Sequence, residues 1–189
     1  IVVTVSNTST PPPPGGGTPV IAWTAADQNP SGSWRNSTWA NRSFRVLLAG
    51  SAITTNGTTV QLTLRGRPSG NYTVQRASLV QREGNTLNGV DGTNRQVTFG
   101  GTWEAGVTVP AGGTVTSDPI PFDLIAGQDV FLTYWVSSGN PTVYRSGGAN
   151  TSAWTINGTD QSSTIDWESL AITATRSYLY IAESLEVIN

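Results

Sequence analysis

The chain contains no cysteine, histidine, methionine or lysine among its 189 residues. Without cysteine, neither a disulfide nor a thiolate zinc site can form. Without histidine, the usual general base and the commonest transition-metal ligand are missing. Without lysine, Schiff-base chemistry, Ser–Lys dyads and Lys–Asn isopeptide crosslinks are excluded. These absences argue against an enzyme, and they fit either biased codon usage or a chemically inert outer surface.

Charge is also scarce, at 12% of residues, and the formal net charge is −2 at pH 7. No basic patch stands out, so nucleic acid is not an expected partner. No segment reaches the roughly 18 apolar residues that a membrane span requires. The chain begins at Ile1 rather than Met, which we interpret as a mature form without its signal peptide. We therefore expect an extracellular or cell-surface protein.

A second, weaker support for secretion is the presence of Asn-x-Ser/Thr sequons. Such motifs also arise by chance in a chain rich in Asn, Ser and Thr, so glycosylation depends on the host. The candidate N-glycosylation sites are Asn7, Asn36, Asn41, Asn56, Asn71, Asn150 and Asn157.

Composition and periodicity predict an all-β domain spanning residues 20–189. Gly, Thr, Ser, Asn and Pro are abundant, and this mixture favours strands and turns over helices. Segments of alternating apolar and polar residues are separated by turn motifs such as Asn56-Gly57. This pattern is typical of an antiparallel, jelly-roll-like β-sandwich. The predicted strands lie at 44–48, 60–65, 72–82, 96–99, 106–109, 114–117, 129–136 and 177–187. The predicted core residues are Val46, Leu48, Val60, Leu62, Leu64, Val130, Leu132 and Tyr134.

The N-terminal segment has a different pattern from the domain. Residues 1–6 are predicted to form a strand with Ile1, Val3 and Val5 on one face. Residues 7–19, rich in Pro and Gly, are predicted to be a linker with a stiff, extended centre. No second strand lies close enough to form a hairpin with residues 1–6, and an isolated apolar strand must find a sheet edge. The sequence therefore predicts donation of this strand to a second copy and head-to-tail assembly.

Four segments of the domain carry a resemblance to a known family. They are Gln96–Gly101, Val107–Asp118, Gln128–Tyr134 and the aromatic-rich Ser177–Val187. Together they resemble the β-sandwich accessory domain found beside GDSL/SGNH hydrolases and in bacterial surface and phage virion proteins. The resemblance implies an accessory or structural sandwich. The Gly-Asp-Ser nucleophile motif and the catalytic histidine of those hydrolases are absent here, so it implies no esterase activity.

Tryptophan is abundant, with seven residues in the chain. Several lie in polar or Gly-rich stretches, where flat aromatic faces beside Asn, Gln and Arg suit stacking on sugar rings. The same residues could instead close the ends of the sandwich or form a subunit contact. The candidate glycan-stacking residues are Trp34, Trp39, Trp103 and Trp154. A polysaccharide-binding accessory module of a secreted polysaccharide-degrading enzyme is therefore the alternative function.

Loop carboxylates offer a possible calcium site. Asp91 and Asp160 each lie in a turn-like segment with the hard oxygen ligands that Ca²⁺ prefers. Neither segment matches an EF-hand loop, and Asx turns explain both without a metal. No other cofactor is expected. The favoured interpretation is a non-enzymatic extracellular subunit that assembles by donating its N-terminal strand.

Overall fold

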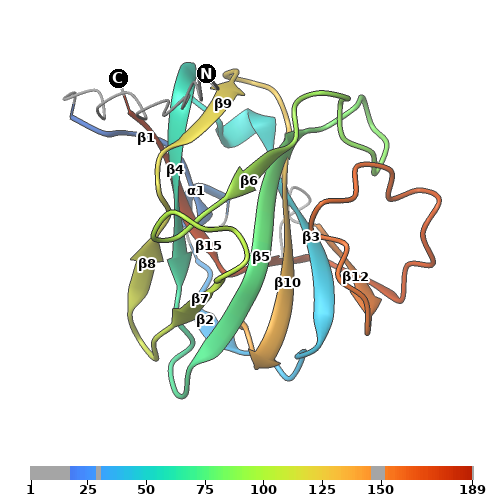
Figure 1. Cartoon of the computed structure of the whole chain (residues 1–189). Coiled ribbons are helices and arrows are strands. Elements are labelled where there is room, and N and C mark those ends of the chain that lie inside the picture. Colours follow the sequence, from blue (N-terminus) through green and yellow to red (C-terminus); the bar gives the residue numbers. More distant parts are fainter. Residues whose placement is uncertain (1–17, 29–30, 146–151, 189) are drawn as a thin grey trace, which may run out of the picture.

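The computed structural model describes residues 18–28, 31–145 and 152–188. The predicted strand at 1–6, with Ile1, Val3 and Val5, lies outside the described residues, as does most of the linker. Within the described ranges, nearly all regular structure is antiparallel β-strand (Figure 1). The predicted all-β sandwich class is therefore confirmed.

The strands form three sheets. The five-stranded sheet has the order β1 (Val20–Thr24), β15 (Ala182–Val187), β4 (Gly57–Arg65) and β8 (Thr114–Thr116), with β9 (Ile120–Leu124) also paired to β4. The seven-stranded sheet has the order β13 (Ala174–Arg176), β12 (Ala153–Asn157), β3 (Arg42–Leu48), β10 (Val130–Gly139), β5 (Tyr72–Gln81) and β6 (Arg95–Val97), with β7 (Val107–Val109) also paired to β5. The three-stranded sheet has the order β14 (Tyr178–Tyr180), β11 (Thr142–Arg145) and β2 (Trp34–Asn36). A short helix α1 (Ala25–Gln28) follows β1, and a 3₁₀ turn (Gly50–Ala52) follows β3.

The main core lies between the five-stranded and seven-stranded sheets. β10 is central to it, because Leu132 pairs with Val46 of β3 on one side and with Leu79 of β5 on the other. The predicted core residues are all at most 1% exposed. In β4 the predicted phase is confirmed by burial, since a slip of one residue would have turned Leu62 and its neighbours outward. In β3 and β10 both faces are buried, and the predicted side chains are distinguished by belonging to the main core, whereas Leu47 and Phe131 belong to a second cluster.

The sequence pattern does not predict several of the described strands, namely β1, β2, β9, β11, β12 and β13. β9 shows one reason. Its burial alternates, with Ile120, Phe122 and Leu124 buried and Pro121 exposed. Proline at 119 and 121 suggests a loop, yet Pro121 is tolerated because β9 pairs with β4 alone. β2 and β13 have only three residues each, too few to show a period of two.

The outer face of the seven-stranded sheet is covered as well. Phe131 and Val80 are fully buried there and form a second cluster with Leu47. The chain between β12 and β13, drawn in orange in Figure 1, lies beside this face. Its Trp167 is also fully buried. The central strand β3 is consequently buried on both faces, whereas the sequence predicts a single inward face.

Candidate binding groove

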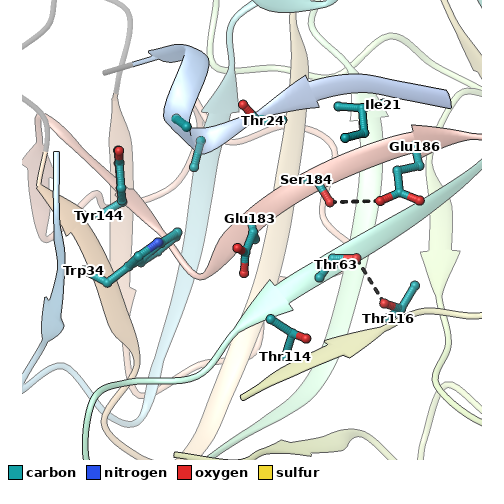
Figure 2. Close-up of a pocket in the computed structure, with 12 residues that line it drawn as sticks. Ile21, Thr24, Trp34, Thr63, Thr114, Thr116, Tyr144, Glu183, Ser184 and Glu186 are labelled. Atoms are coloured by element: carbon teal, nitrogen blue, oxygen red, sulfur yellow. Dashed lines mark hydrogen bonds between the residues drawn. The ribbon is translucent and has the colours of Figure 1, made fainter. Parts of the chain in front are cut away.

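A groove of about 560 Å³ opens on the outer face of the five-stranded sheet (Figure 2). Its floor consists of outward-facing residues of β15 and β4. β1 and α1 border it on one side, β8 on another, and β2 and β11 at one end. Residues from six strands of the chain therefore meet in a single concave site.

A sharp bend at Ile181 creates this concave shape. The predicted strand 177–187 divides there, because Ile181 has a φ of +57°, a conformation that β-branched residues rarely adopt. The residue is fully buried, and its carbonyl accepts a hydrogen bond from the Arg65 amide at 2.7 Å. Before the bend, β14 joins the three-stranded sheet; after it, β15 joins the five-stranded sheet. The two sheets therefore diverge at the position where the groove lies.

Two aromatic side chains form one end of the groove. The ring centroids of Trp34 and Tyr144 are 4.8 Å apart, with planes tilted by 57°. Trp34 is half-buried and Tyr144 is almost fully buried. Burial raises the pKa of Tyr144 above its ordinary value. Packing against Tyr144 thus holds the Trp34 indole at the groove wall.

Hydroxyl and carboxylate groups form the other end. The hydroxyls of Thr63 and Thr116 lie 3.0 Å apart, and the Ser184 hydroxyl donates to Oε1 of Glu186 at 3.4 Å. In β4 the alternation that buries the leucines on either side of Thr63 turns Thr63 outward. The wall therefore combines acceptors with groups that both donate and accept.

Glu183 lies between the aromatic and hydroxyl ends (Figure 2). Its Oε1 accepts a hydrogen bond from Nη1 of Arg65 at 2.8 Å. Its Oε2 is buried and has no hydrogen-bond donor among the described residues. A carboxylate oxygen in this situation requires a partner, because buried polar atoms are almost always hydrogen-bonded.

Of the four tryptophans proposed for sugar stacking, Trp34 lines the groove and the other three have different surroundings. The Trp39 ring is contacted by the guanidinium groups of Arg42 at 4.4 Å and Arg176 at 4.6 Å. These cation–π contacts compete with any sugar for its faces.

Trp103 lies against the seven-stranded sheet, and Trp154 belongs to its strand β12. The Trp103 indole donates to the carbonyl of Ala77 at 2.9 Å, and the Arg76 guanidinium lies 5.0 Å from its ring. Trp154 meets Phe131 edge-on at 5.9 Å. The sequence finds the aromatic groups but cannot indicate which of them share a site.

The sequons occupy surface positions wherever the structure describes them. Asn7 and Asn150 lie outside the described residues. Exposed sequon asparagines are Asn36, Asn41, Asn56, Asn71 and Asn157. Each exposed site leaves room for a glycan, which agrees with the sequence-based prediction without testing it.

The two calcium candidates differ in their environments. Asp160 accepts hydrogen bonds from the amide and hydroxyl of Ser162 at 2.9 and 2.6 Å and from Arg76 at 3.1 Å. Asp91 lies exposed in a turn. Within residues 18–28, 31–145 and 152–188, no group of three or more acidic, His or Cys side chains is arranged to hold a metal ion. Asp160 therefore already has the internal partners of an Asx turn.

No family model matches the chain, and no curated protein matches it. The resemblance to the sandwich beside GDSL/SGNH hydrolases therefore stays a prediction from its quoted motifs. In the part of the chain that the structure describes, no helix has the length and apolar character needed to cross a membrane.

Proposed function

We propose that the chain is a non-enzymatic extracellular structural subunit that assembles head to tail, into a filament or a surface layer. The joint would form when residues 1–6 of one copy add to a sheet of the next. The apolar face of Ile1, Val3 and Val5 supports this proposal, because such a strand is stable only when paired and covered. The resemblance to structural sandwiches of surface and virion proteins supports it as well.

The observation that carries the proposal is the surface at the end where the linker enters the domain. The exposed large hydrophobic side chains of the described residues are Val20 at 42%, Ile21 at 56% and Ile125 at 48%. The sheet register places the start of β1, the end of β15, the start of β4 and the end of β9 at this same end. Apolar residues that gather beside a chain terminus suit a contact between subunits.

The linker is long enough for exchange between subunits. If every residue from 7 to 19 were extended in the polyproline manner, the linker would span about 40 Å, which is its maximum reach. A domain the size of residues 20–189 has a radius of gyration of about 15 Å, and hence a diameter of about 40 Å. A strand on such a tether can therefore reach past its own domain to a neighbour.

The energetics indicate that the strand does not act alone. Burial of three aliphatic side chains contributes about 5–8 kcal/mol, and each backbone hydrogen bond adds about 1 kcal/mol net. Ordering six residues opposes this by about 1–2 kcal/mol per residue. These terms nearly cancel, so contacts between domain bodies must contribute, and Val20, Ile21 and Ile125 are suitably placed for them.

Deletion of residues 1–6 tests the proposal. The truncated chain should keep the circular dichroism spectrum of the full chain, yet it should sediment as a monomer and form no filaments in electron micrographs. A triple substitution of Ile1, Val3 and Val5 to Ser should have the same effect. The matched control exchanges Thr4→Ser and Ser6→Thr, leaves the apolar face intact and should assemble normally. Unchanged assemblies after the deletion would show that the proposal is wrong.

The second candidate is a carbohydrate-binding accessory module. The specific observation in its favour is the groove in which Trp34 stands beside Tyr144, with carboxylates and hydroxyls along the same wall. Aromatic surfaces combined with a few placed polar groups are typical of small-ligand sites. If the full chain is monomeric at high concentration, this candidate becomes the better account.

A further inference from the structure

We infer that the groove is a binding site for an uncharged oligosaccharide, with Trp34 as the stacking surface and Glu183 as an acceptor of sugar hydroxyl groups. The inference concerns the groove alone and holds whether the chain is a filament subunit or an accessory module. It rests on the partly exposed carboxylate of Glu183, the charges at the groove and the arrangement of its two ends.

The first step is the carboxylate of Glu183. Its Oε1 is held by Arg65, whereas its buried Oε2 has no donor among the described residues. A buried acceptor without a donor is costly, and the cost is larger for a charged group. Oε2 itself has almost no accessible surface, but the Glu183 side chain is 31% exposed, and Oε1 keeps a second lone pair beside its bond to Arg65. A sugar hydroxyl in the groove can donate to Oε1, in a charge-assisted bond that is stronger than one between neutral groups. The Arg65 contact fixes the carboxylate before the ligand arrives, which reduces the entropy lost on binding.

The second step is charge. Glu183 and Glu186 line the groove, and no Arg is among the described residues that line it. The nearby Arg65 is already paired with Glu183. The Arg65–Glu183 pair is neutral as a whole, so Glu186 leaves the groove with one net negative charge among the described residues that line it. This charge disfavours uronates, sulfated sugars and phosphates and selects against acidic glycans.

The third step is the arrangement of the two ends. Trp34, held in place by the buried Tyr144 behind it, provides an aromatic surface on which the C–H face of a sugar ring can stack. At the other end, Thr63, Thr116 and Ser184 offer hydroxyl groups that match sugar hydroxyls as donors or acceptors. The volume of about 560 Å³ lies within the range of small-ligand sites. A ligand with one stacking face and hydroxyls along its length fits both ends at once.

Two sources could present this ligand, namely a free polysaccharide or a neutral glycan attached to a sequon of another copy. The two share the same chemistry and differ in their response to deglycosylation. If enzymatic removal of N-glycans increases the affinity for added oligosaccharide, the groove normally takes a glycan from another copy. If the affinity is unchanged, the ligand is a free polysaccharide.

Isothermal titration calorimetry of the full chain tests the inference, with cellohexaose, maltohexaose, xylohexaose and chitohexaose as neutral probes and an oligogalacturonate as the acidic probe. At least one neutral probe should bind saturably, and the oligogalacturonate should bind at least roughly tenfold more weakly. Trp34→Ala and Glu183→Gln should each weaken binding of the neutral probe by at least roughly tenfold.

Matched controls separate the groove from folding and assembly. Trp154→Ala removes a half-buried indole that lies against the other sheet, and Glu168→Gln neutralises an exposed loop carboxylate; both should bind as the unmodified chain does. Assembly in electron micrographs should persist in Trp34→Ala, so failure of the groove and failure of strand donation are distinguishable. The inference is overturned if no neutral probe binds, if Trp34→Ala and Glu183→Gln bind normally, or if the oligogalacturonate binds best.

Discussion

The guanidinium group of Arg45 lies 4.8 Å from the centre of the Trp167 ring and is almost fully buried with it. Arg45 belongs to β3, and Trp167 to the chain between β12 and β13. Nε of Arg45 donates to Oγ1 of Thr133 at 3.0 Å. Its Nη atoms donate to three loop carbonyls at 2.6–2.9 Å, those of Leu87, Thr164 and Ile165. The residue therefore fastens two loops to the outer face of the seven-stranded sheet.

Burial lowers the pKa of Arg45 to about 9, with the negative charge of Asp166 acting in the opposite direction. The side chain is thus still charged at neutral pH. No carboxylate among the described residues forms an ion pair with it, so its charge is stabilised by carbonyl dipoles and by the faces of Phe131 and Trp167.

Replacement of Arg45 by Met should be strongly destabilising. It keeps much of the aliphatic volume but leaves three loop carbonyls without their donor, each at a cost of about 1–3 kcal/mol. We expect a loss of about 3 kcal/mol or more in the free energy of unfolding, measured by urea denaturation. The matched control is Arg35→Met in exposed β2, which should change stability by less than about 0.5 kcal/mol. If Arg45→Met leaves the free energy of unfolding unchanged, the role assigned to this arginine is wrong.

The sequence predicts well which side chains lie between the two large sheets. It predicts poorly which side chains are buried on the outer face of the seven-stranded sheet. Residues such as Leu62 follow a period of two, and one buried face is sufficient to explain that pattern. Arg45 and Leu47 lie on the opposite face of β3, where the sequence indicates solvent. Arg45 is buried because a distant loop carrying Trp167 covers it, and Leu47 is buried in the cluster against which Trp154 packs. No local pattern records which segment covers a sheet.

The groove was predictable only in part, for a similar reason. Trp34 is identified from its polar surroundings as a residue that could stack on a sugar. Tyr144 and Glu183 lie more than a hundred residues further along the chain. Tyr144 meets Trp34 because β11 pairs with β2 at these two residues, and Glu183 lines the same groove after the strand bends at Ile181. A positive φ at a β-branched residue is set by tertiary contacts, so the sequence predicts one continuous strand there.

A second prediction concerns the main core. Leu62 is fully buried in β4 between the two large sheets. Leu62→Ala should reduce the free energy of unfolding by about 2–5 kcal/mol, because the lost burial is accompanied by a cavity. Thr58→Ala, at an exposed position of the same strand, should have little effect. A cost below about 1 kcal/mol for Leu62→Ala would contradict close packing at this site.

A third prediction concerns Gly66, the residue that follows β4. Its amide donates to the carbonyl of Gly113 at 2.7 Å, and a Cβ at this position would overlap the carbonyl oxygen of Pro110. Gly66→Ala must therefore displace the backbone, and it should lower the free energy of unfolding by more than about 2 kcal/mol. Gly84→Ala is an informative control, since Gly84 has a φ of +53° and open space around it. That substitution should lower the free energy of unfolding by only about 1 kcal/mol, because it introduces conformational strain without a steric overlap. Equal costs in urea denaturation would refute the steric explanation.

The last prediction concerns acid stability and Asp118. Its carboxylate accepts hydrogen bonds from the Thr98 hydroxyl at 2.7 Å and from the amides of Gly101 and Gly100 at 2.7 and 3.2 Å. These bonds, with Thr98 as the largest contributor, hold the pKa of Asp118 below its ordinary value. The folded state then binds this proton less readily than the unfolded state does. The stabilisation is complete above the ordinary aspartate range, near pH 4, and is lost as the pH falls through the lower folded-state pKa.

Asp118→Asn should accordingly lower the free energy of unfolding at pH 7. Between pH 5 and pH 2 this free energy should then fall by less in the variant than in the unmodified chain. Urea denaturation at a series of pH values measures both effects. The control is Asp123→Asn, an exposed position in β9 where no side-chain hydrogen bond is formed with the described residues. It should retain the acid dependence of the unmodified chain. If Asp118→Asn also retains that dependence in full, the three hydrogen bonds to Asp118 do not contribute to acid stability, and the turn at Gly100 and Gly101 must be held by its backbone alone.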